Sequence, residues 1–153
     1  FSGRDGRSTI FDYWSMDSVN HGYFDIRKKT PSERKLMDAY KRVMLIAEKE
    51  KAASRGLTFD LMYVNGHLAQ SQYAFLRKKD DELLLVVVNF AAEAIDTGVI
   101  IPSHAFVYMS IAEGDADAVE LLSDGKAKLH LAVNEAVNVA VPAYGGVVYK
   151  IKQ

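Results

Sequence analysis

Two hydrophobic patterns divide the sequence. From Thr30 to Gly56 apolar residues recur at helical spacing, and after Gly56 they alternate with polar residues. A period near 3.6 indicates an amphipathic helix and a period of 2 indicates strands, whereas residues 1–29 show neither period. The pattern therefore predicts an ordered loop over residues 1–29, a helix over 30–56 and a domain of strands over 57–153.

The helix prediction rests on its ends as well as on its apolar stripe. Thr30 and Glu33 have the spacing of a capping box, and Pro31 suits the first helical position. Gly56 suits a left-handed stop. We therefore expect one continuous helix over Pro31–Arg55. Its stripe consists of Leu36, Met37, Tyr40, Val43, Met44 and Ala47.

The third segment carries short alternating runs separated by turn residues. The stretch "ELLLVVVNF" is apolar on both faces and predicts a central strand covered on both sides. Asp124-Gly125 predicts a tight hairpin turn, because both residues tolerate positive φ. Short strands at this spacing predict a mainly β fold, an antiparallel β-sandwich preceded by a long amphipathic α-helix. The expected strands are Thr58–Val64, Gln72–Arg77, Glu82–Phe90, Thr97–Ile101, Phe106–Ile111, Val119–Leu122, Ala127–Ala132, Val137–Val141 and Val147–Ile151. The other turn signals are Asn65-Gly66, Lys79-Asp80-Asp81, Glu113-Gly114-Asp115 and Gly145-Gly146.

Composition narrows the function classes only broadly. The chain is 49% apolar and 25% charged, as in an ordinary globular domain. With a net charge of −1, the chain has no excess of positive charge with which to bind nucleic acid or an anionic membrane. The absence of Cys excludes disulfides and thiolate catalysis, and the run "LLLVVVNFAA" is too short to cross a bilayer. We therefore expect neither a nucleic-acid partner nor a membrane partner.

Charge also changes at the proposed boundary. Residues 1–56 carry twelve Lys/Arg and eight Asp/Glu, a net charge of +4. Residues 57–153 carry seven and twelve, a net charge of −5. This shift supports a division of the chain near Gly56.

Residues with metal-binding or catalytic chemistry are scattered. The charge clusters Arg77–Glu82 and Glu113–Asp117 are typical of solvated turns, and the second lacks the closing Glu of a calcium loop. We find no nucleophile motif and no Gly-rich phosphate loop, so the sequence predicts no catalytic residue and no cofactor. No metal site is predicted either, because the spacing of the histidines does not bring ligands together. These are His21, His67, His104 and His130.

Several stretches together resemble one known family. They are "GRDGRSTIFDYWSM", "KLMDAYKRVMLIA", "YAFLRKKDDELLLVVVNF", "VIIP" and "VPAYGGVVYKI". Along essentially its whole length the chain is similar to the C-terminal end of bacterial α-amylase-type enzymes, the family 13 glycoside hydrolases. The resemblance implies that residues 1–29 are a loop from the end of the (β/α)₈ catalytic barrel, 30–56 the last barrel helix and 57–153 the C-terminal β-sandwich domain, called domain C. It also implies that the chain is a piece of a longer enzyme.

The same resemblance implies a function. In this family the catalytic carboxylates lie upstream of the region that matches Phe1, so no catalytic residue is transferred and we expect the chain alone to be inactive. The implied role is a non-catalytic domain of an enzyme acting on α-glucans, which stabilises the catalytic barrel as its partner. A periplasmic or extracellular location is suggested by the resemblance alone.

Two alternatives stay open. The sandwich could be a carbohydrate-binding module for starch or maltooligosaccharides, which needs paired exposed aromatic side chains. The candidates for such pairs are Tyr63, Tyr73, Phe75, Phe106, Tyr108, Tyr144 and Tyr149. A free-standing small enzyme or signalling sandwich is less favoured, because no catalytic motif is present.

The opening loop and the helix carry the remaining hypotheses. Tyr13 and Trp14 are candidates for contact with a glucose ring, or they anchor the loop by packing. The helix Pro31–Arg55 presents an apolar stripe that needs a partner, so we expect the isolated chain to dimerise through it or to refold its N-terminal segment. The acidic and basic residues of the loop either line the rim of a substrate cleft or form salt bridges; they are Arg4, Asp5, Arg7, Asp12 and Asp17.

Overall fold

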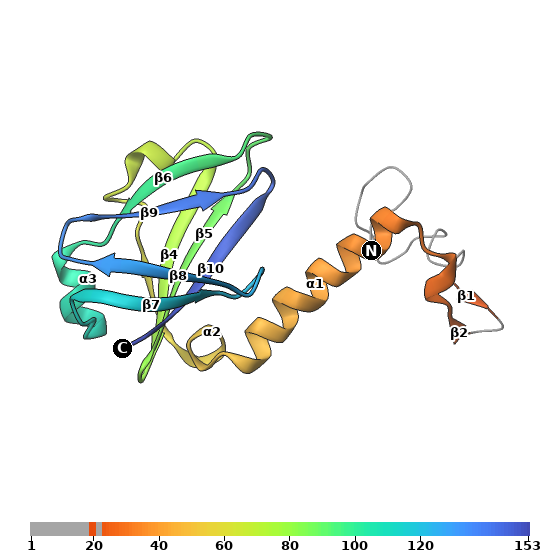
Figure 1. Cartoon of the computed structure of the whole chain (residues 1–153), viewed down its shortest axis with the longest axis horizontal. Helices are drawn as coiled ribbons and strands as arrows, with labels where there is room; N and C mark the ends of the chain where they lie inside the picture. Colours follow the sequence, from red (N-terminus) through yellow and green to blue (C-terminus); the bar gives the residue numbers. More distant parts are fainter. Residues whose placement is uncertain (1–18, 21–22) are drawn as a thin grey trace. The chain divides into compact units, whose positions relative to one another are not determined.

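A computed structural model describes residues 19–20 and 23–153 of the chain (Figure 1). Tyr13 and Trp14 therefore lie outside the described residues. So do His21 and the charged loop residues named above, Arg4, Asp5, Arg7, Asp12 and Asp17. The chain divides into two compact units, residues 1–45 and 46–153. Each unit is described by itself.

The first unit contains short elements followed by most of a long helix. The strands β1 (Val19–Asn20) and β2 (Tyr23–Phe24) pair antiparallel, and the 3₁₀ helix η2 (Ile26–Lys28) follows. The helix α1 (Pro31–Lys49) then begins at the predicted capping box. The Glu33 amide donates to Thr30 Oγ1 at 3.2 Å, and the Thr30 amide donates to Glu33 Oε2 at 2.8 Å. The hydrogen bond from the Thr30 amide and a second one from the Thr30 hydroxyl to Glu33 Oε2, at 2.9 Å, lower the pKa of the Glu33 carboxyl.

The predicted single helix over Pro31–Arg55 is interrupted. The helix α1 ends at Lys49, Glu50 is extended with φ −84° and ψ 118°, and α2 (Lys51–Arg55) follows. Local periodicity continues through Glu50, so the break comes from tertiary contacts that hold α2 on the sheet. Gly56 also differs from expectation because its backbone is extended. A Cβ there would lie 2.3 Å from the Ala52 carbonyl oxygen, so a close approach requires this glycine.

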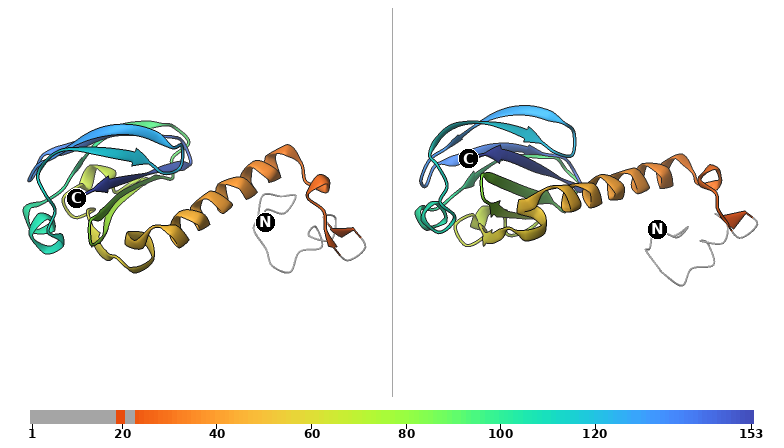
Figure 2. Two further views of the ribbon diagram at one scale, coloured as in Figure 1. Left: turned by 60° about the horizontal axis from the view of Figure 1, so that its bottom comes forward. Right: turned by 90° about the horizontal axis from the view of Figure 1, so that it is seen from below.

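The second unit is an antiparallel sandwich of two unequal sheets (Figures 1 and 2). The large sheet has six strands in the order β3-β4-β5-β10-β7-β8, and the small sheet pairs β6 with β9. The bounds are β3 Leu57–Asp60, β4 Gln72–Lys79, β5 Glu82–Asn89, β6 Ile95–Ile100, β7 Gly114–Glu120, β8 Gly125–Leu131, β9 Ala136–Val141 and β10 Gly145–Lys152. The mainly β fold and the antiparallel sandwich after a long helix are confirmed.

The core fills the space between the two sheets. Alternate residues of the large sheet point into it, among them Ala74 and Leu76 of β4 and Leu85 of β5. Leu84 of β5 points to the opposite face and is also buried, because Ala52 of α2 and the residues around it cover that part of the sheet. The prediction that β5 is central and covered on both faces is therefore confirmed for this part of the strand.

The strand predicted over Phe106–Ile111 is wrong. This segment belongs to the helix α3 (Ser103–Met109), which lies at one end of the sandwich (Figure 1). Ala105, Phe106 and Met109 are its buried residues, which is helical spacing that a short apolar run does not distinguish from a strand. Ser110 then ends the helix in the left-handed conformation, with φ 51°.

One strand prediction and three turn predictions also shift. The strand expected over Thr58–Val64 ends at Asp60, whose Oδ1 accepts a hydrogen bond from the Met62 amide at 2.7 Å. Glu113-Gly114-Asp115 is not a turn, because β7 begins at Gly114. Gly145-Gly146 begins β10. The β7–β8 hairpin is confirmed, but its loop spans residues 121–124 and only Asp124 takes a positive φ, 62°.

Candidate functional site

The sheet face turned away from the small sheet is unusually apolar. We call it the outer face and define it by Tyr73, Phe75, Val86, Val88 and Val148. Their neighbours along the strands point into the core, so these side chains point outward. The register of β4, β5 and β10 places these side chains next to one another, since Phe75 pairs with Val86 and Val86 pairs with Val148. The rings of Tyr73 and Phe75 lie 5.8 Å apart. These side chains are only partly buried.

Polar contacts fasten the helix junction to one end of the outer face. The Ala52 amide donates to Glu82 Oε1 at 2.8 Å, and Arg77 donates to the Ala52 carbonyl at 3.0 Å and to the Ala53 carbonyl at 2.8 Å. Lys150 forms salt bridges with Glu50 and, at 3.2 Å, with Glu82. The hydrogen bond that Lys150 donates to Glu50 is the main cause that raises the pKa of Lys150, and Glu82 adds to it against the opposing effect of burial.

This arrangement corrects the interpretation of the Arg77–Glu82 cluster as a solvated turn. Lys79 and Asp80 do form an exposed ion pair in the turn, at 3.3 Å. Arg77 and Glu82, however, carry the contacts that hold α2. Charge pattern alone does not separate the two groups, because the distinction depends on which sheet face each side chain occupies.

The Glu113–Asp117 cluster is a strand segment and not a calcium loop. Asp115 Oδ1 accepts a hydrogen bond from His130 Nδ1 at 2.6 Å across the β7–β8 pair. This bond is the main cause that raises the pKa of His130. The other described histidines lie elsewhere, His67 beside Gly98 and His104 beside Tyr63. Among the described residues, no group of His, Asp and Glu could hold a metal ion.

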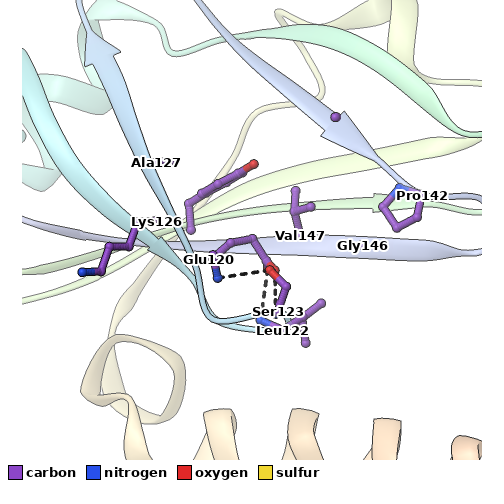
Figure 3. A pocket seen from close by; sticks show the side chains of 11 residues that line it. Glu120, Leu122, Ser123, Lys126, Ala127, Pro142, Gly146 and Val147 are labelled. Atoms are coloured by element: carbon purple, nitrogen blue, oxygen red, sulfur yellow. Dashed lines mark hydrogen bonds between the residues drawn. The ribbon is translucent and has the colours of Figure 1, made fainter.

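A pocket of about 420 Å³ opens between the β7–β8 loop and the start of β10 (Figure 3). Its carboxylate, Glu120, is fully engaged. Oε2 accepts hydrogen bonds from the Ser123 hydroxyl at 2.6 Å and the Ser123 amide at 2.8 Å, and Oε1 accepts from the amides of Leu122 and Val148 at 3.1 and 2.9 Å. Burial raises the pKa of Glu120, but these hydrogen bonds outweigh it and the net shift is downward. Glu120 thus holds the loop.

This pocket does not support glycosidase chemistry. Hydrolysis of a glycosidic bond requires two carboxyl groups facing each other across the bond. Glu120 is the single acidic side chain lining the pocket, and both of its oxygens are occupied by structural hydrogen bonds. We therefore assign no catalytic role to it.

A second aromatic group lies at the end of the sandwich that carries α3. We call it the aromatic platform and define it by Phe59, Tyr63, His104 and Tyr108. The ring centroid of Phe59 lies 6.3 Å from that of Tyr63, 5.4 Å from that of His104 and 6.2 Å from that of Tyr108. The Tyr63 hydroxyl is hydrogen-bonded to His104 Nε2. Tyr63 and Tyr108 are 58% and 57% exposed, whereas Phe59 is partly buried against the core.

The structure separates the other aromatic candidates. Phe106 and Tyr108, expected to share a strand face, lie on a helix instead, where Phe106 is buried and Tyr108 is exposed. Tyr149 packs against the core, and Tyr144 lies exposed in the turn before β10. Tyr73 and Phe75 belong to the outer face. The sequence missed Phe59 and His104 because only the folded chain brings their rings together.

A family comparison identifies the domain. Residues 63–152, more than half of the chain, match the model of the α-amylase C-terminal all-β domain. The chain belongs to this family. The predicted resemblance to α-amylase-type enzymes is confirmed. Among curated proteins, none matches the chain at a significant level.

Solved structures show that the domain shares its fold with parts of larger enzymes. An α-amylase from Geobacillus thermoleovorans complexed with acarbose matches with TM-score 0.60 and 13% identity, over 85% of this chain and 25% of that one. A maltogenic α-amylase from Thermotoga neapolitana matches with TM-score 0.59 and 11% identity, over 86% and 28%. The trehalose-6-phosphate hydrolase of Bacillus licheniformis matches with TM-score 0.54 and 20% identity, over 86% and 21%. The chain thus spans about a quarter of the length of these neighbours.

Proposed function

We propose that this α-amylase C-terminal domain serves, without catalytic residues of its own, to cover and stabilise the catalytic barrel of an enzyme acting on α-glucans. The outer face carries the proposal. A sheet face in contact with water normally presents polar side chains in alternation with the buried ones. Val86 and Val148 pack against the cluster of Ala52, Leu84 and Leu121 at the helix junction. Beside it this face presents Tyr73, Phe75 and Val88, which suits contact with another protein surface.

The helix α1 supports the same role. Leu36, Tyr40, Val43 and Met44 lie along its apolar stripe and are 40–68% exposed. Exposed apolar groups of this size mark surfaces that bind another protein. The position of the chain within longer neighbours of the same fold supports a catalytic barrel as that protein.

The test compares substitutions on the outer face with one elsewhere. Phe75→Ser or Val88→Ser in the complete gene product should speed thermal inactivation, because each removes apolar contact worth about 1.5–3 kcal/mol when fully buried. Val107→Ser is the control, since Val107 is 81% exposed on α3. The 153-residue chain alone should lose much less stability from Phe75→Ser. Equal losses in the chain and in the complete product would contradict docking through the outer face.

A glucan-binding module is the second candidate function. The aromatic platform is the observation that favours it, because Tyr63 and Tyr108 are 58% and 57% exposed and each lies beside Phe59. Tyr13 and Trp14 stay proposed carbohydrate contacts. A shift of Trp14 fluorescence on addition of maltoheptaose would support that role, and an unchanged spectrum would count against it.

A further inference from the structure

We propose that the aromatic platform is a binding subsite for two or more glucose units of an α-glucan. The choice of α-glucan as the ligand rests on the proposed function. The existence of a binding surface rests on the contacts of Phe59, Tyr63, His104 and Tyr108.

Hydrogen bonds of a buried side chain hold the platform in place before any ligand binds. Tyr63 lies in the loop after β3, and this loop is fixed by Asn65, which is fully buried. The Asn65 side-chain amide donates to the carbonyls of Leu61 at 2.8 Å and Ile100 at 2.9 Å, and its oxygen accepts from the Ile100 amide at 2.8 Å. Asn65 thus joins the loop of Tyr63 to the end of the strand that leads into α3.

The helix α3 presents two platform residues, His104 and Tyr108, on one of its faces. His104 and Tyr108 are four residues apart in this helix, so their side chains lie side by side. The hydrogen bond between Tyr63 and His104 then links the helix to the loop. Rings held in this way lose little conformational freedom when a ligand binds, which favours binding by exposed groups.

The platform surface combines apolar ring faces with hydroxyl groups, as a sugar ring does. Tyrosine offers a large apolar face with a hydroxyl at its rim, and a pyranose offers C–H groups on its faces with hydroxyls at its rim. None of the four platform residues is a carboxylate, Lys or Arg, so none of them carries a permanent charge to recognise an ionic ligand. An uncharged sugar therefore suits it better than a phosphorylated or acidic compound.

The rings of the platform are inclined to one another. The ring planes of Tyr63 and Tyr108 are inclined to that of Phe59 by 53° and 48°. Phe59 is partly buried, but the exposed rings of Tyr63 and His104 are also tilted, by 34°, so the ring faces do not form one flat surface. They suit successive units of an α-1,4-linked chain, which curves, better than the flat ribbon of a β-1,4-linked chain.

The position of the platform allows both proposed roles to operate together. In β3, Thr58 accepts a hydrogen bond from Arg77 at 2.7 Å on the side of the sheet that holds α2. Phe59 is the next residue and packs against the core, on the opposite side. Phe59 therefore faces away from the outer face, so the two proposed surfaces are separate.

The test is an NMR titration of the 153-residue chain with maltoheptaose. We expect the ring signals of Tyr63, Tyr108 and His104 to shift, and Tyr63→Ala and Tyr108→Ala each to weaken binding about three- to tenfold. Tyr144→Ala is the matched control, because Tyr144 is 76% exposed and lies in another turn. It should leave the affinity unchanged, and cellohexaose should bind more weakly than maltoheptaose.

Several results would overturn the proposal. They are the absence of shifts at the platform, an equal loss of affinity in Tyr144→Ala, and equal binding of cellohexaose. A platform that instead docks protein would show no maltoheptaose binding, and Tyr63→Ala would speed inactivation of the complete gene product.

Both tyrosine side chains are mostly exposed, so thermal unfolding of the variants should match that of the parent chain. Phe75→Ser should not affect maltoheptaose binding, which separates this test from that of barrel docking.

Discussion

Buried polar side chains join the strands and loops of the sandwich. Asn89 is 1% exposed, and its amide donates to the carbonyls of Glu93 at 2.8 Å and Pro142 at 3.1 Å. The Glu120 carboxylate accepts hydrogen bonds from the amides of Ser123 and Val148 and so joins the β7–β8 loop to β10. Because an unpaired polar group in such a place is costly, each of these side chains specifies one arrangement of the chain around it.

Glu120 makes stability depend on pH in the acid range. Its pKa is lowered in the folded chain, so its contribution is fully present above the unfolded pKa and is lost as pH falls through the folded pKa. Glu120→Gln should lower the free energy of unfolding by about 1–3 kcal/mol at neutral pH. It should also flatten the loss of stability on acidification, which urea unfolding at a series of pH values would measure.

The control for this prediction is Asp117→Asn, on the same strand but exposed. It should change the stability little at any pH. If Glu120→Gln keeps the acid dependence of the parent chain, the hydrogen bonds to Ser123 and Val148 do not stabilise the ionised carboxylate.

Among the elements, the junction of α1 and α2 depends on charged groups. Glu82 is 8% exposed and has Lys150 and the Ala52 amide as partners. Lys150→Met should remove the positive charge that pairs with the Glu82 carboxylate. It should lower the free energy of unfolding by about 1–2 kcal/mol, because the site is only partly open to water. The Ala52 amide should then exchange its hydrogen faster. Lys152→Met, two residues further along β10 and exposed, should leave that exchange rate unchanged. Protection retained in Lys150→Met would contradict this account.

The stripe of α1 supports a prediction about assembly. We expect the isolated chain to dimerise through the exposed stripe of α1 (Pro31–Lys49), because burying several large apolar side chains is worth about 1.5–3 kcal/mol each. Light scattering after size exclusion should give a dimer, and Tyr40→Ser with Met44→Ser should give a monomer. Lys41→Ser, also exposed on α1, is the control. A monomeric parent chain with α1 intact would disprove the prediction.

The sequence predicts the elements unevenly for physical reasons. The capping box and the central strand β5 depend on local chemistry and periodicity, so both could be predicted. The break at Glu50 depends on Lys150, which is distant in sequence, and α3 depends on a core that Phe106 enters. The aromatic platform joins β3, its following loop and α3, so no pattern along the chain indicates it.

At the scale of the whole molecule, the account depends on surfaces that the sandwich leaves apolar. Its core is complete between the two sheets, yet the outer face and the α1 stripe present further apolar side chains. No described helix is long and apolar enough to cross a membrane. The combination of a complete core with apolar exterior surfaces fits a domain that supports another one.

The most direct test of the central claim is an assay of starch hydrolysis, run in parallel on the 153-residue chain and on the complete gene product. The account predicts release of reducing sugar by the complete product and none by the chain. Turnover of starch by the chain alone, lost when Glu120 is changed to Gln, would contradict it.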